Sequence, residues 1–440
     1  MKPRTPSSHD PLRRALAAAA ATLGLASPGL STARPPPDPQ VAGNMLLRLS
    51  STAALSPLLA RYQLSLVSQF GARPIYRVQV AAGADVDSTV EALSLEPEVV
   101  TAEPNFVHSA PEARKNVVWA IGTAAEYTAQ WAPQAMRLPE AQLTSKGAGV
   151  RVAVLDTGVD ASHPALAGKL LPGRDFVDGD NDPAETGSTA DAGFGHGTHV
   201  AGLVALAAPE AKIVPLRVLD AQGSGDIWVL AQALLYAIDP DGNPATNDGA
   251  QVVNLSMGTL ERTRILDTVM QLAACSMPDL RDPANLLTDP GYDGDKRRCS
   301  AFSGAVIVAA AGNGGNRSEK QYPAAEGVYG LLPMGASAQN ERMAAFSNRG
   351  SWVDVAAPGD RVTSSVPGGG YGTWSGTSMA SPLAAGAAAL LRARFPKMKP
   401  VDVAKRIEQN GARLCGDTNI VQVDAAAALK DREPPDLDCR

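Results

Sequence analysis

The fold of this chain is constrained most by a regular alternation of strand-like and helix-like segments that begins at residue 152. Short apolar runs, typical of buried parallel strands, alternate with longer runs of helical periodicity. Strands separated by helices need crossover connections, which predict an α/β fold with a mostly parallel central sheet and helices on both faces. Active sites in such sheets lie at the carboxyl ends of the strands. We expect strands at 152–155, 212–219, 251–255 and 306–311, and helices at 199–208, 227–238, 264–274, 379–395 and 401–410.

A smaller unit precedes this alternation, at residues 42–112. Its apolar runs and one helical segment follow each other with a β-α-β rhythm, which predicts a small α/β, ferredoxin-like module. Strands are expected at 45–49, 75–80 and 99–103, and a helix at 87–95.

The first 34 residues are typical of a secretory signal peptide. Basic residues precede a short apolar run at 15–26, and Ser and Pro follow it. That run is too short to cross a bilayer as a helix. It predicts an exported protein, extracellular or periplasmic, without membrane contact once the signal is removed; a frayed, Ala-rich amphipathic start is the alternative. The Pro-rich stretch 35–41 is expected to be a linker.

Charge and cysteine content narrow the functional classes. The net charge is −6 and no extended run of Lys or Arg is present, which argues against nucleic acid as a partner. The four cysteines allow three disulfide connectivities, and export favours disulfides over a catalytic cysteine. We favour the pairs Cys275–Cys299 and Cys415–Cys439, because each joins sequence neighbours and the second would hold the charged tail 431–440.

Three short motifs supply the residue types needed for nucleophilic acyl transfer. Asp156 ends the apolar run Val-Ala-Val-Leu-Asp, His196 lies in Gly-His-Gly-Thr-His, and Ser378 lies in Gly-Thr-Ser-Met-Ala. A serine becomes a nucleophile when a histidine takes its proton and an acid orients that histidine. No histidine follows His199, so the order serine, acid, histidine of α/β-hydrolases is excluded for Ser378. The order that remains is Asp156, His196, Ser378.

These blocks, complete and in this order, resemble those of the subtilase family of serine peptidases over roughly residues 120–430. The resemblance implies a peptidase domain at 113–430 that hydrolyses protein or peptide substrates through an acyl-enzyme. It implies that Ser378 is the nucleophile, His196 the general base and then acid, and Asp156 the residue that orients the imidazole.

Two further blocks fit the same resemblance. Asn313, in Ala-Ala-Gly-Asn-Gly, is similar to the family's oxyanion-hole asparagine, with the backbone N–H of Ser378 as its partner. The segment Ser256, Met257 and Gly258 is similar to the family's substrate-binding edge strand, where a peptide pairs by β-addition.

The resemblance also implies a role for the small N-terminal unit. Its segment 99–108 is similar to the end of the family's inhibitor prodomain, which assists folding and leaves its last strand in the cleft. We therefore expect a self-processed zymogen, cleaved between about His108 and Glu126. The expected product is a monomer that requires no cofactor, with its own prodomain as an intramolecular inhibitor.

Some assignments have alternatives. His199 could bind a metal together with His196, although a packed helix histidine is favoured. The acidic loops 175–182 and 239–248 are candidates for structural calcium, against the simpler reading of solvated surface acids. Gln321 is a candidate for the floor of the main specificity pocket. Rival functions are a catalytically silent binding protein of the same shape and an esterase or transferase with the same acyl-enzyme.

Overall fold

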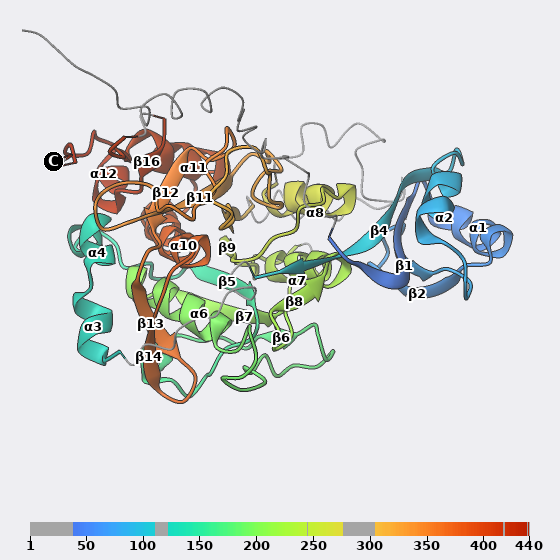
Figure 1. The fold of residues 1–440 in the computed structure, drawn as a ribbon, viewed down its shortest axis with the longest axis horizontal. Helices are drawn as coiled ribbons and strands as arrows, with labels where there is room; N and C mark the ends of the chain where they lie inside the picture. Colours follow the sequence, from blue (N-terminus) through green and yellow to red (C-terminus); the bar gives the residue numbers. More distant parts are fainter. Residues whose placement is uncertain are drawn as a thin grey trace, which may run out of the picture. The chain divides into compact units, whose positions relative to one another are not determined.

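The computed structural model describes residues 38–110, 122–243, 245–275, 304–416, 419–437 and 439 (Figure 1). The predicted signal peptide 1–34 and the linker up to residue 37 lie outside these residues. No helix in the described part of the chain combines the length and the apolar composition needed to span a bilayer.

The main sheet has nine strands in the order β15-β16-β12-β11-β10-β9-β5-β7-β6. Its central strands pair in parallel: β5 with β7 and β9, and β10 with β9 and β11. This confirms the predicted α/β class. The bounds are β5 Arg151–Asp156, β6 Arg174–Asp175, β7 Lys212–Arg217, β9 Val252–Leu255, β10 Val306–Ala310, β11 Leu331–Ser337, β12 Val355–Pro358, β15 Ala412–Arg413 and β16 Val421–Gln422.

Helices cover both faces of this sheet (Figure 1). Because strand side chains alternate between faces, Val152 and Val154 pack with α6 (His196–Ala207) and α10 (Thr377–Arg394). Ala153 and Leu155 pack on the other face, with α7 (Ile227–Ile238) and α8 (Arg264–Ala273). The first face also holds α11 (Pro400–Gln409) and α12 (Ala425–Lys430).

The N-terminal unit is an antiparallel sheet in the order β2-β3-β1-β4 with a core of its own. The element order β-α-β-β-α-β agrees with the ferredoxin-like module expected from the sequence. The sequence pattern did not predict α1 or β2. The strand β2 is an edge strand with largely exposed side chains and shows no alternation. The bounds are β1 Gln40–Leu49, α1 Leu55–Tyr62, β2 Ser65–Gln69, β3 Ile75–Gln79, α2 Val86–Leu93 and β4 Val99–Ser109.

The described structure also contains elements that the sequence pattern did not predict, and two helices begin two or three residues earlier than expected. The helix α6 begins at His196 instead of 199, and α10 begins at Thr377 instead of 379. His196 and Ser378 therefore lie in first turns of helices. The further elements are η2 Thr52–Ala54, α3 Ala124–Ala129, α4 Trp131–Ala135, α5 Leu138–Gln142, η4 Pro164–Leu166, β8 Ser224–Asp226, and the hairpin β13 Val362–Val366 with β14 Gly370–Trp374.

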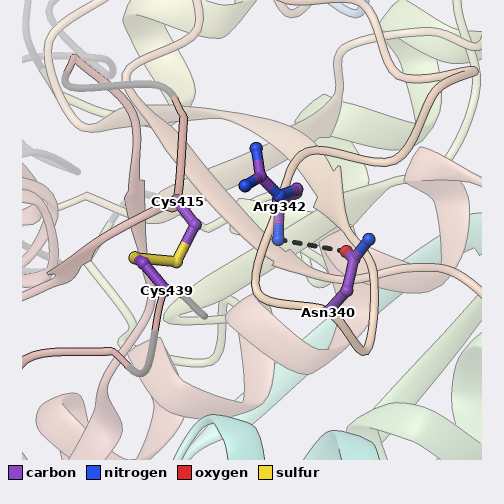
Figure 2. Close-up of a disulfide and its surroundings, with 4 residues drawn as sticks. All are labelled: Asn340, Arg342, Cys415 and Cys439. Atoms are coloured by element: carbon purple, nitrogen blue, oxygen red, sulfur yellow. Dashed lines mark hydrogen bonds between the residues drawn. A yellow bond between two sulfur atoms is a disulfide. The ribbon is translucent and has the colours of Figure 1, made fainter.

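A disulfide joins Cys415 to Cys439, as the sequence suggested (Figure 2). Cys415 follows β15, and its N–H donates to the carbonyl of Glu341 at 2.9 Å, in the turn where Asn340 accepts from the N–H of Arg342. The bond therefore ties the C-terminal tail to this corner of the main sheet. The other expected pair includes Cys299, which lies outside the described residues.

Candidate active site

Asp156 and His196 are brought together by the end of a strand and the beginning of a helix. Asp156 is the last residue of β5, and its buried Oδ1 accepts from Nδ1 of His196 at 2.6 Å. The same oxygen accepts from the N–H of Thr157 at 2.8 Å. A carboxylate that accepts at Nδ1 fixes the imidazole tautomer and leaves Nε2 as the ring nitrogen that can take a proton.

The glycine after His196 allows this close approach. A Cβ added at Gly197 would lie 2.1 Å from the carbonyl oxygen of Gly158 and 3.1 Å from Cβ of Asp156. Any side chain at this position would push the helix away from the strand end. The second glycine of the Gly-His-Gly pattern is therefore explained by the close packing of α6 against the end of β5.

Ser378 is the second residue of α10 and exchanges hydrogen bonds with Ser256. Its Oγ donates to the carbonyl of Ser256 at 3.1 Å, and Oγ of Ser256 donates to the carbonyl of Ser378 at 3.0 Å. The second bond has a clear cause. Pro382 has no N–H, so it cannot donate the usual helical hydrogen bond to the carbonyl of Ser378 four residues earlier. Ser256 donates to that carbonyl instead and ties the predicted nucleophile to the segment after β9.

Sequence reasoning missed the groups that support this pair. Nδ2 of Asn254 donates to Oγ of Ser256 at 2.9 Å, and Oδ1 of Asn254 accepts from Oγ of Ser381 at 2.7 Å. Both side chains are fully buried. Asn254 lies in the expected strand 251–255 and Ser381 in the expected helix 379–395, so the signal was a polar residue at a position that the pattern predicts to be buried.

Asn313 follows β10 and holds the first turn of α10. Its Oδ1 accepts from the N–H of Thr377 at 2.9 Å and from Oγ1 of Thr377 at 3.0 Å. Because Oδ1 is used in this way, Nδ2 is the side of the amide that can donate to a developing negative charge. The backbone N–H of Ser378 belongs to the same helix terminus, where N–H groups have no partner within the helix.

The end of β4 lies against the predicted substrate-binding segment. Ser109 and Gly258 exchange two backbone hydrogen bonds of 3.0 Å, and the N–H of Ala110 donates to the carbonyl of Gly223 at 2.9 Å. β4 also pairs antiparallel with β8. The chain before residue 111 therefore runs as an extended strand between two backbone edges. Of the three predicted substrate-binding residues, Gly258 offers its backbone and Ser256 contacts Ser378, whereas Met257 is buried in the core.

A pocket of about 190 Å³ opens beside this strand. Gly258 and Asn313 form part of its lining, together with Gln321. The side chain of Gln321 packs between two glycines, since an added Cβ would lie 2.5 Å from it at Gly258 and 1.7 Å from it at Gly312. The amide of Gln321 therefore fills part of the space between these glycines at the edge of the pocket.

The two other histidines near the site have structural roles. Nε2 of His199 bonds to the carbonyl of Gly372 at 3.1 Å, and its ring stacks on Trp374 with 4.5 Å between centroids. Burial lowers the pKa of His199 to about 3, so it stays neutral. Nε2 of His163 donates to the carbonyl of Gly370 at 2.7 Å, and Nδ1 accepts from the N–H of Ala165. The contacts of His199 agree with the favoured interpretation of a packed helix histidine, and those of His163 tie the N-terminus of η4 to the beginning of β14.

The two acidic loops differ in how their charge is balanced. In the first, Arg217 pairs with Asp175 and Asp178, so a side chain supplies the positive charge. In the second, carboxylate oxygens of Asp239, Asp241 and Asp248 lie within 4.8 Å of one another. Among the described residues, this is the one cluster of three or more such groups with a spacing that suits a metal ion.

Comparisons with known proteins point to one family. The family model described as the Subtilase family matches residues 147–427. The thermophilic serine proteinase of Bacillus sp. (strain AK1) is 35% identical over 343 residues, which are 76% of this chain and 72% of that protein. Thermitase of Thermoactinomyces vulgaris is 36% identical over 297 residues, which are 65% of this chain and 90% of that protein.

A solved structure is similar in fold. The crystal structure of fervidolysin from Fervidobacterium pennivorans, a keratinolytic enzyme related to subtilisin, has a TM-score of 0.67 to this chain. The sequences are 24% identical, and the match covers 91% of this chain and 62% of that chain.

Proposed function

Since the chain belongs to the subtilase family of serine endopeptidases, we propose that Asp156, His196 and Ser378 form its catalytic triad. The observation that carries the proposal is the 2.6 Å bond from the buried imidazole of His196 to Asp156. Its second support is that Ser378 lies at a helix N-terminus beside Asn313, where negative charge is favoured.

In the proposed reaction, Nε2 of His196 takes the proton of Ser378 as Oγ attacks the carbonyl carbon of the peptide bond. Asp156 stabilises the imidazolium that forms. Nδ2 of Asn313 and the N–H of Ser378 stabilise the oxyanion, and His196 then protonates the leaving amine. Water releases the acyl-enzyme by the same steps in reverse order, with His196 as the base.

The N-terminal unit, residues 42–112, is proposed to be an inhibitor prodomain of a zymogen. The support is its last strand, which pairs with Gly258 on one side and with Gly223 on the other, as an extended peptide would. Because Ser109 and Ala110 lie in these pairs, we propose that self-cleavage occurs after Ala110 and before Glu126. We further propose that residues 1–34 direct export and are removed.

Calcium is proposed as a structural ion at the loop that holds Asp239, Asp241 and Asp248. Three carboxylates with neighbouring oxygens are the hard ligands that Ca²⁺ prefers. No step of the proposed reaction uses this ion.

Labelling with a fluorophosphonate tests the catalytic proposal. We expect one label on Ser378 in the secreted protein, and neither label nor N-terminal processing in Ser378→Ala. Both chains are read by intact mass, so label and cleavage are seen together. A correctly processed wild-type chain that takes no label would refute the triad and favour a silent binding protein. Turnover of esters without turnover of peptides would favour the esterase.

A further inference from the structure

A partly buried glutamate that the reaction above does not use lies beside the triad. Glu185, in the loop before α6, accepts four hydrogen bonds, two on each oxygen. Its Oε1 accepts from Oγ1 of Thr157 at 2.6 Å and from the N–H of Gly195 at 3.0 Å. Its Oε2 accepts from Oγ1 of Thr198 at 2.7 Å and from the N–H of Thr198 at 3.2 Å.

These donors lie next to Asp156 and His196 in the chain, the two residues that the proposed proton transfer involves. Thr157 follows Asp156 directly, whereas Gly195 and Thr198 lie on either side of His196 along the chain. Oγ1 of Thr157 also accepts from the N–H of Gly197 at 2.9 Å, which links the strand end to the helix a second time. The carboxylate thus joins the end of β5 to the first turn of α6.

The number of donors shows which form of Glu185 fits this position. All four groups donate, and only an ionised carboxylate accepts at both oxygens without offering a proton. Two of the donors are N–H groups at the beginning of α6, where a negative charge is stabilised. Burial, and to a smaller extent the charge of Asp156, raise the pKa of Glu185 to about 7, against the effect of these hydrogen bonds.

We propose that Glu185 is a positioning residue, which holds Asp156 and His196 in the geometry of the triad proposed above. It does not line the pocket beside the substrate-binding segment. Its loss should therefore slow the chemical step and leave substrate binding nearly unchanged. A role in folding alone would lower stability and leave turnover per active site intact.

The test compares Glu185→Gln with Glu210→Gln in the full-length, self-processed enzyme. Glutamine has one acceptor oxygen and one NH₂ group. Two of the four groups that donate to Glu185 would therefore face this NH₂ group, which is itself a donor. We expect kcat per fluorophosphonate-titrated site to fall about 10- to 100-fold, with KM changed less than about twofold. Glu210 is an exposed carboxylate whose nearest cation, Lys146, lies 3.7 Å away, and its variant should behave as wild type.

A spectroscopic signature separates positioning from stability. The proton on Nδ1 of His196, held at 2.6 Å from Asp156, should give a low-field NMR signal in wild type and in Glu210→Gln. In Glu185→Gln this signal should shift or broaden. A folded Glu185→Gln enzyme with an unchanged kcat and an unchanged signal overturns the proposal, as does an effect on KM alone.

A second variant decides the matter if Glu185→Gln does not fold. Thr198→Val removes one of the four donors and leaves the carboxylate, and we expect kcat to fall several-fold with KM nearly unchanged. An unchanged kcat in that variant overturns the proposal. Failure of the triad itself is recognised separately, because a processed wild-type chain would then take no fluorophosphonate label.

Discussion

The proposed catalytic centre and the contact of the N-terminal unit with the helices beside it both bury ionisable groups, but they do so differently. At the centre, His196 has the carboxylate of Asp156 as its partner. At the contact, Glu103 accepts from the N–H groups of Arg264 and Ile265 at the beginning of α8, and His108 bonds to the carbonyl of Asp226 at 3.1 Å.

This difference predicts that the two regions respond to different changes, one to substitution and the other to pH. Burial raises the pKa of Glu103 to about 7, and burial lowers the pKa of His108 to about 4. Groups shifted in this way respond to pH, because each titrates differently when the contact opens. The catalytic centre should therefore respond to substitution through turnover, and the contact should respond to acidity through affinity.

The largest expected effect is the loss of charge at the catalytic centre. Asp156→Asn removes the carboxylate that fixes the tautomer of His196, and we expect kcat to fall about 10⁴-fold. The measurement is kcat on a peptide substrate, with protein that has been matured separately because self-processing should also be slow. If the kcat of Asp156→Asn stays within tenfold of wild type, Asp156 is not the acid of the triad. The contrast between the two regions would then not hold.

A smaller effect is expected from the oxyanion donor. Asn313→Ala removes Nδ2 together with the Oδ1 that accepts from Thr377. Loss of one such oxyanion donor in a serine peptidase slows turnover about 10²–10³-fold. KM should change little, because the donor acts on charge that develops only in the transition state. Asn316→Ala, in the same loop but without contact to Thr377, is a suitable control. Equal loss in both variants would mean that the loop has collapsed.

At the N-terminal contact, two variants should give opposite dependences on pH. The raised pKa of Glu103 stabilises the contact fully below about pH 4.5, and this is lost as pH rises through about 7. The lowered pKa of His108 stabilises it above about pH 6.5, and this is lost as pH falls toward about 4. In wild type the two contributions nearly cancel between pH 7.5 and 5.

The variants remove one contribution each. On going from pH 7.5 to 5, inhibition by the added N-terminal unit should weaken roughly 30-fold in Glu103→Gln and strengthen by a similar factor in His108→Asn. The measurement is the inhibition constant of this unit against the mature enzyme at both pH values. If both variants keep the flat profile of wild type, neither group titrates at this contact.

The same contrast explains what could be predicted from the sequence. The proposed catalytic residues lie in short contiguous motifs, with Asp156 at the carboxyl end of an apolar strand and His196 and Ser378 at the beginnings of helices. The fold and the candidate triad could therefore be predicted from one pattern. Glu185 and Asn254 owe their positions to loops and neighbouring strands that meet only in three dimensions. Glu103 lies in a strand whose residues alternate, and only the docking against α8 makes it buried. Strand β2 escaped prediction for a related reason, since an exposed edge has no apolar period.

The smallest expected effect concerns the acidic loop that holds Asp239, Asp241 and Asp248. These side chains are only partly buried or exposed, so an ion there would add stability without touching the reaction. Calcium at ten times its Kd would add about 1.4 kcal/mol, which is a rise in Tm of roughly 2 °C for a chain of this length. Chelation should lower the Tm of Ser378→Ala by that amount and should leave the Tm of the double variant with Asp241→Asn unchanged. Asp182→Asn, in the loop where Arg217 pairs with two other carboxylates, should keep the full response to chelation. If chelation leaves the Tm of all three chains unchanged, the loop binds no calcium and its carboxylates are only solvated.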